Sequence, residues 1–305
     1  MDRVQQYGYL LAFENRFLKA KGDGFQRLFE ELMGRVYPAD FEACRPYGPQ
    51  GDRKNDGYLP SQRTLFQLYA PYEIDSARTI AKVKEDFFGA VQHWRDHFDC
   101  WIFVHNAFDV RLPPNVIETL AEIRRDHPGL VIKTWGYLEL ETEFRKLDAP
   151  VLASWLGVMP TAEDKSRLGF AEIKAVVEHL KLVPGEPGGT PRPVPFGKIE
   201  FNLLSEAVAA YLKIGMEKAP LVGDYFARCR DPMYGVRVAT SFKARYGELR
   251  DRSPALHPAE IWGELEDWAG GNQTTNPTEK LAIIAVLAWL FDHCDIFEEP
   301  PRAEP

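Results

Sequence analysis

Apolar positions recur at helical spacing near the start of the chain. From Tyr7 to Lys21 they fall on one side of a helix, and a second apolar stripe begins after Asp23, a residue suited to open a helix. Two shorter runs, Phe41–Arg45 and Thr64–Ala70, have the length and alternation of strands. The pattern therefore predicts two helices followed by strands.

Helices and strands then alternate along the chain. A helix near Ser76–His93 precedes Trp101–His105, a continuous apolar strand that we expect to be buried on both faces. The elements that follow are a helix opened by Pro114, a strand at Leu130–Trp135 and a helix at Leu138–Leu147. Such alternation is typical of βαβ units, so it predicts an α/β domain over residues 1–150.

Beyond Pro150 the apolar residues recur almost only at helical spacing, which predicts a mostly α-helical domain over residues 151–305. Residues 184–195 hold proline or glycine at 8 of 12 positions, which favours a loop inside this domain. The segment Thr278–Cys294 is apolar almost all round, and a helix of this kind must be buried. We expect it at the centre of the helical domain or at a partner-docking surface.

Composition and charge exclude several classes of protein. With 45% hydrophobic and 27% charged residues, the 305-residue chain has the composition of a globular protein and not of a disordered one. The longest apolar run, Leu281–Phe291, has 11 residues, and a bilayer span needs about 18. A net charge of −8 argues against a uniformly basic DNA-coating protein, although a local basic face stays possible. We expect a cytoplasmic protein, because its start lacks the features of a signal peptide.

Three polar positions suggest chemistry. Glu14 interrupts the apolar stripe of the first helix, where an ionised carboxylate needs a partner or a metal. Asp56 lies in a turn-rich loop, and a hairpin could bring it beside Gln67 on the next strand. Together they would form the all-oxygen ligand set that Mg²⁺ prefers. Two alternatives stay open: an ion pair at the edge of the core for Glu14, and a solvated turn for the loop.

These residues resemble a known family of nucleases. Glu14 in the first helix, Gly-Asp-x-x-x-Asp-Gly at residues 51–57 and Gln67-x-Tyr69 on an apolar strand are similar to the PD-(D/E)XK core in its Mrr-like and defence-effector versions. Asp56-Gly57 indicates a tight turn or a strand entry, and with that strand counted the predicted α-β-β-β-α-β order matches the fold of this family. The resemblance implies a restriction-endonuclease-like α/β core in which Glu14, Asp56 and Gln67 hold Mg²⁺ or Mn²⁺ and DNA is the substrate.

Tyr69 stands where this family has lysine, and tyrosine cannot supply a permanent positive charge beside a phosphate. The replacement candidates are Lys54, two residues before Asp56, and Lys82 and Lys84 on the helix after the strand, with Asp52 and Tyr69 as secondary candidates for the site. Helical spacing places Lys84 nearer the apolar stripe than Lys82. We expect Lys54 first and a helix lysine second, with one ammonium within about 6 Å of the Asp56 and Gln67 side chains.

Other strings in the chain resemble a bacterial defence component of the ABC-three-component class, among them FENRF, FQLYAP and WIFVHN. This resemblance implies an effector with a C-terminal coupling domain, a separate ABC-type ATPase and a small middle subunit. The chain has no G-x-x-x-x-G-K-[ST] motif, so the ATPase would be another chain. Two functions stay open: a metal-dependent DNA endonuclease effector, and a catalytically inactive nuclease-fold subunit that binds DNA or scaffolds the ATPase. A homo-oligomer is possible in either case.

Overall fold

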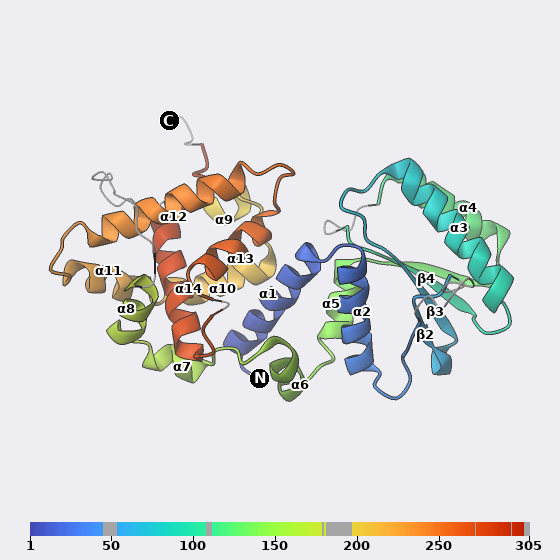
Figure 1. Ribbon diagram of the computed structural model, residues 1–305, viewed down its shortest axis with the longest axis horizontal. Helices are drawn as coiled ribbons and strands as arrows, with labels where there is room; N and C mark the ends of the chain where they lie inside the picture. Colours follow the sequence, from blue (N-terminus) through green and yellow to red (C-terminus); the bar gives the residue numbers. More distant parts are fainter. Residues whose placement is uncertain are drawn as a thin grey trace. The chain divides into compact units, whose positions relative to one another are not determined.

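The computed structural model describes residues 1–44, 54–107, 112–178, 180, 197–271, 273–293 and 295–301. These residues form a mixed α/β structure with one five-stranded sheet (Figure 1). The chain divides into two compact units: residues Arg16–Val151, the sheet unit, and Met1–Asn15 with Leu152–Pro305, the helical unit. The division after Val151 falls beside the boundary predicted at residue 150. Helix α1 (Arg3–Lys19) contributes residues to both units.

The sheet unit contains all five strands in the order β1-β2-β3-β4-β5. The strands are β1 (Glu42–Ala43), β2 (Gly57–Leu59), β3 (Thr64–Tyr69), β4 (Cys100–His105) and β5 (Val131–Trp135). The first two pairings are antiparallel and the last two are parallel. The 3₁₀ turn η2 (Pro60–Gln62) joins β2 to β3. Four strands lie where the pattern predicts them, whereas β2 is so short that the sequence indicated only a strand entry.

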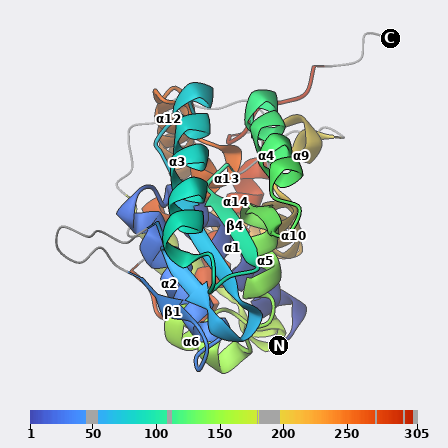
Figure 2. The same ribbon diagram turned by 90° about the vertical axis from the view of Figure 1, so that its right-hand side faces the viewer.

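Helices cover both faces of this sheet. Helices α3 (Ser76–Trp94) and α4 (Pro114–Asp126) connect the parallel strands and lie side by side on one face (Figures 1 and 2). Helices α2 (Asp23–Val36) and α5 (Tyr137–Phe144) lie on the other face (Figure 1). Buried residues of α3, α4, β3 and β4 form one apolar cluster. Strand β4 is buried over five of its six residues, which confirms the prediction for this strand.

Alternation along β3 decides which of its side chains face helices α3 and α4 and which face helices α2 and α5. Leu65 belongs to the apolar cluster with Val83 and Phe87 of α3, and Tyr69 packs against the same cluster. Phe66 points the other way, with its ring centroid 5.2 Å from that of Phe29 in α2. Because side chains alternate along a strand, Gln67 shares the face of Leu65 and Tyr69.

The helical unit is built around α14 (Pro277–Asp292), whose ten buried residues run from Leu281 to Phe291. Its other helices are α6 (Ala149–Leu156, which begins in the sheet unit), α7 (Ala162–Arg167), α8 (Phe170–Glu178), α9 (Lys198–Phe201), α10 (Glu206–Met216), α11 (Ala219–Ala227), α12 (Tyr234–Arg250) and α13 (Pro258–Trp268). Helices α8, α10 and α11 pack directly on α14 (Figure 1). The prediction of a central buried helix is confirmed, and the loop predicted at 184–195 lies outside the described residues.

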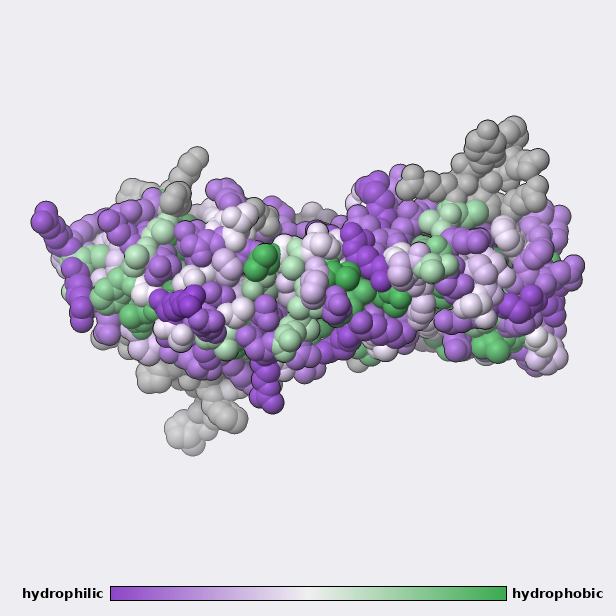
Figure 3. Space-filling view, turned by 90° about the horizontal axis from the view of Figure 1, so that it is seen from below, coloured by the Kyte–Doolittle hydropathy of each residue, from purple (hydrophilic) through white to green (hydrophobic). Residues whose placement is uncertain are grey.

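Large exposed apolar side chains are spread over both units and include Tyr72, Phe88, Phe201 and Leu203. On the face shown in Figure 3, hydrophobic residues are mixed with hydrophilic ones, as is usual for a globular surface. Within the described ranges, no helix combines the length and the apolar character that a membrane span requires.

Candidate functional site

The β2–β3 ladder ends at the pair of Gly57 and Phe66, one residue short of Asp56 and Gln67. The backbone N–H of Asp56 donates to the Phe66 carbonyl at 3.0 Å. Its carboxylate Oδ2 accepts the Leu68 N–H at 2.7 Å, which fixes the orientation of the carboxylate. Asp56 therefore contacts the residues on either side of Gln67 in β3.

The side chains of this pair are buried. Gln67 is 2% exposed, and its Oε1 accepts no hydrogen bond within the described part of the chain. The neighbouring Asn55 is 1% exposed, and its Oδ1 also accepts no hydrogen bond from the described residues. A buried carbonyl oxygen without a donor is unfavourable, and each such group in a native structure calls for a ligand, a water or an ion.

These oxygens suit a hard cation only in part. Carboxylate and amide oxygens are ligands of Mg²⁺, which often keeps several waters beside one or two carboxylates. In the described ranges, however, no three His, Cys, Asp or Glu side chains gather into a group that could hold a metal ion. A cation at this place would therefore be held by Asp56 together with the Gln67 amide oxygen.

Glu14 lies in the helical unit, whereas Asp56 and Gln67 lie in the sheet unit. It is fully buried, and its Oε2 accepts a hydrogen bond from Ser205 Oγ at 2.9 Å. Ser205 also caps α10, because its Oγ accepts the Val208 N–H. The buried carboxylate thus has the specific partner that its place in an apolar stripe requires. The three predicted metal ligands are not in one unit, and the role of Glu14 as a ligand stays a prediction.

The lysine candidates have different surroundings. Lys54 Nζ lies 2.5 Å from Glu85 Oε1 and 3.3 Å from Asp86 Oδ1, both on α3. Lys82 Nζ lies 2.8 Å from the same oxygen of Asp86. Lys82 is half-buried and Lys84 is exposed, so the expectation that Lys84 lies nearer the apolar stripe was wrong. The two residues lie about 200° apart around the helix, one on each side of the apolar stripe. A small error in the centre of the stripe therefore reverses which lysine is nearer to it.

Asp86 is the residue that sequence reasoning missed. It is fully buried on α3, and its Oδ2 has no hydrogen-bond partner among the described residues. Burial raises the pKa of its carboxyl above the ordinary value, and the two lysines act in the opposite direction. The available signal was an acidic residue next to the apolar stripe position of Phe87, the same kind of signal that marked Glu14.

Tyr69 and Asp52 are the secondary candidates. The ring of Tyr69 lies 6.2 Å from that of Phe103, measured between centroids, so this side chain takes part in the packing of the α3 face. Asp52 lies outside the described residues. Neither position contributes a positive charge.

His105 ends β4 at the carboxyl edge of the parallel strands. It is 4% exposed, and its Nδ1 accepts the Ala107 N–H at 3.2 Å. Burial lowers the pKa of His105 from 6.5 to about 4, against the weaker opposing effect of Glu139. The imidazole is therefore neutral at pH 7 and caps the end of the strand.

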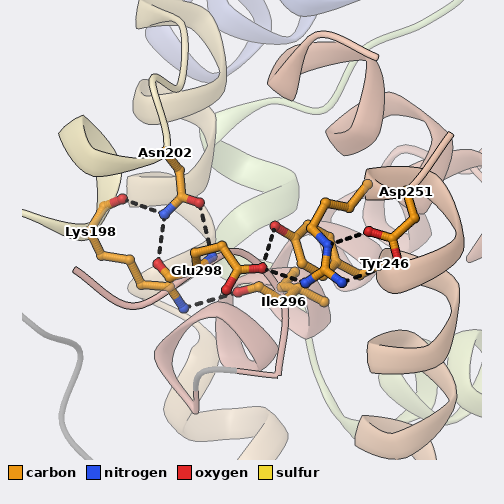
Figure 4. Close-up of polar contacts among 7 residues, drawn as sticks. Lys198, Asn202, Tyr246, Asp251, Ile296 and Glu298 are labelled. Atoms are coloured by element: carbon orange, nitrogen blue, oxygen red, sulfur yellow. Dashed lines mark hydrogen bonds and ion pairs between the residues drawn. The ribbon is translucent and has the colours of Figure 1, made fainter. Parts of the chain in front are cut away.

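The helical unit has a separate polar network around the end of α14 (Figure 4). Lys198 is 1% exposed, and its Nζ donates to the carbonyls of Phe291 at 2.7 Å and Ile296 at 2.9 Å. The Asn202 amide donates to the Glu298 carbonyl and accepts the Glu298 N–H. Arg250 holds the Glu298 carboxylate at 2.8 Å. These contacts fix residues 296–298 against α9 and α12.

Comparison with known families assigns this part of the chain. Residues 171–298 match C-terminal domain 10 of the ABC-three component (ABC-3C) systems. The match begins in α8 and ends at Glu298, so it contains α14 and the network that fixes the residues after it. This domain belongs to the ABC-3C systems, which are defence systems. No curated protein and no solved structure matches the chain. The restriction-endonuclease-like core of the sheet unit stays a prediction.

Proposed function

We propose that the chain is the effector of an ABC-3C defence system. In this proposal the sheet unit is a metal-dependent DNA endonuclease, and the C-terminal domain couples it to a separate ABC-type ATPase and a small middle subunit. The observation that carries the proposal is the Asp56 carboxylate, held by the Leu68 N–H next to Gln67, whose buried amide oxygen accepts no hydrogen bond within the described residues, in a chain with an ABC-3C C-terminal domain.

Each residue of the site has a defined part. Asp56 and Gln67 would hold Mg²⁺ or Mn²⁺, which supplies an activated water and stabilises charge on the phosphate. The Leu68 N–H orients the Asp56 carboxylate, and burial of Gln67 keeps its carbonyl oxygen away from competing solvent. Lys54, two residues before Asp56, adds positive charge for the phosphodiester.

Plasmid cleavage tests this function. The purified chain, with and without the two partner subunits, is incubated with plasmid and Mg²⁺ or with EDTA. We expect Asp56→Ala to abolish cleavage, because the carboxylate that holds the metal acts in the transition state. The variant should also lose about 1 to 3 kcal/mol of stability, because the Leu68 N–H loses its acceptor. Asp126→Ala, at an exposed position on α4, is the matched control and should cleave as the wild type does. Equal nicking by the Asp56→Ala variant and the wild type would refute the assignment.

A second function is favoured by Tyr69. Its ring packs on Phe103 at the position where the nuclease family has lysine, which suits a nuclease fold without catalysis. Such a subunit would bind DNA or scaffold the ATPase. The same assay separates the two functions, because a scaffold leaves the plasmid intact in the presence of both partners and Mg²⁺.

A further inference from the structure

Two locally unfavourable features meet where Lys54 touches α3. Lys54 has a φ of 62°, the left-handed region that residues other than glycine seldom adopt. Gly89 lies inside α3, where glycine is a poor helix former compared with alanine. Strained backbone of this kind persists only where the surrounding structure holds it, and it is frequent at functional sites.

The contact explains why position 89 is glycine. A Cβ built on Gly89 would lie 2.5 Å from Lys54 Cγ and 3.4 Å from its Cβ. Any side chain at position 89 would therefore displace the stem of Lys54 from the helix. The left-handed backbone of Lys54 and the missing side chain of Gly89 together allow this lysine to lie on α3.

The ammonium at the end of this stem contacts two carboxylates, the exposed Glu85 at 2.5 Å and the buried Asp86. Asp86 Oδ1 contacts Nζ of Lys54 at 3.3 Å and Nζ of Lys82 at 2.8 Å. The carboxylate is fully buried, while the lysine side chains keep 28% and 29% of their area exposed. Asp86 thus joins two lysines whose side chains stay partly exposed.

This cluster lies on the face of the sheet that carries Gln67. Leu65 and Tyr69, which flank Gln67 on the same face of β3, pack with the inner residues of α3. Asp86 is buried on that helix, and Lys54 precedes Asp56 by two residues. The chain therefore brings the lysine to the Gln67 face through α3, and not through the strand position that Tyr69 occupies.

We infer that Asp86 is a positioning residue that holds Lys54 on the Gln67 face of the sheet, with Gly89 providing the space, so that the Lys54 ammonium binds the phosphodiester of DNA. The inference rests on the proposed function and adds a residue that the nuclease resemblance does not supply.

The test uses the full chain, alone and with its proposed partner subunits. Asp86→Asn removes the charge, Lys54→Met removes the ammonium, and Gly89→Ala keeps every charge but fills the space beneath Lys54. Gly34→Ala, in α2, is the matched glycine control because a Cβ there meets nothing within 4 Å. Lys133→Met, at an exposed position on β5, is the lysine control. If Asp86→Asn does not fold, Gly89→Ala still tests the inference.

Three measurements are made on each variant. Acylation of Lys54 by a hydroxysuccinimide ester, followed by mass spectrometry, reports whether the amine is held. Asp86→Asn and Gly89→Ala should speed it severalfold, because the released amine is no longer held against α3 and the Asp86 carboxylate. Binding of a fluorescent DNA duplex without divalent metal should lose about one unit of salt dependence in these variants and in Lys54→Met. Plasmid cleavage with Mg²⁺ should slow by about 100-fold in all three. The controls should behave as the wild type.

The possible failures are distinct. Unchanged acylation in both Asp86→Asn and Gly89→Ala would overturn the positioning of Lys54. Wild-type DNA binding and cleavage by Lys54→Met would overturn its action on the phosphate, even if acylation responds. If the wild type cleaves nothing while acylation and salt dependence still respond as expected, the proposed nuclease function fails and the inference stands for DNA binding.

Discussion

Replacing Gly89 by alanine gives a sharp test of the contact between Lys54 and α3, because helix propensity and packing act in opposite directions. Alanine is favoured over glycine by about 1 kcal/mol inside a helix. The new methyl group, however, would lie 2.5 Å from Lys54 Cγ and must displace this side chain. Displacement removes the contact with the buried Asp86, and an interaction with a charged group contributes about 2 kcal/mol. The contact with Glu85, which is 64% exposed, adds little.

The expected result is a net loss of about 1 kcal/mol for Gly89→Ala, the difference between these two effects. In a Lys54→Ala background the obstruction is gone, so Gly89→Ala should instead stabilise α3 by about 1 kcal/mol. The coupling energy between the two positions is then about 2 kcal/mol. Gly34→Ala should stabilise α2 by about the same amount in both backgrounds, because its Cβ enters open space.

Hydrogen exchange followed by mass spectrometry is the suitable assay. It gives the free energy of opening for α3 and α2 separately, whereas a global unfolding curve would mix the two units of the chain. If Gly89→Ala stabilises α3 in the wild-type background as much as Gly34→Ala stabilises α2, Lys54 does not lie on the helix and the reasoning is refuted.

The remaining predictions concern both units. Glu14→Gln keeps an acceptor for Ser205 and removes a buried charge, so it should slightly raise the melting temperature. It should also reduce cleavage less than Asp56→Ala does. A large fall in melting temperature would instead indicate that Glu14 forms a core ion pair. Burial lowers the pKa of His105 from 6.5 to about 4, so between these pH values the unfolded chain binds a proton that the folded chain does not. The free energy of unfolding should therefore fall by about 3 kcal/mol as the pH falls through this range. Urea titrations should show that His105→Asn removes this slope, and an unchanged slope would contradict the assignment. Deletion of residues 278–305 removes α14 from the centre of the helical unit and should give insoluble protein; a soluble, folded truncation would contradict this placement.

The elements that could be predicted from the sequence are those whose own residues indicate burial, whatever packs against them. Strand β4 is a continuous apolar run, and α14 is apolar on all sides, so burial follows from composition alone. The approach of Asp56 to β3 was also predictable, because a hairpin is a local structure.

What could not be predicted depends on residues far apart in the chain. Glu14 and its partner Ser205 are separated by 191 positions, and no spacing rule connects them. Lys54 reaches α3 only because of a left-handed backbone and a glycine at position 89. Asp86 was not predicted, because periodicity arguments count apolar residues. An acidic residue beside an apolar stripe is nevertheless informative, because a buried carboxylate needs a partner.

The energetics of Asp86 favour a functional reason for this cluster. Replacing a buried ion pair by apolar side chains of similar volume is often neutral or stabilising, so the lysine–aspartate contact is weak evidence for stability. The backbone of Lys54 adds strain of about 1 to 3 kcal/mol, and Gly89 gives up about 1 kcal/mol of helix propensity. A fold that only had to anchor this loop to α3 would be served better by an apolar contact. Three unfavourable choices that converge on one ammonium therefore favour the proposed anion site over a purely structural anchor.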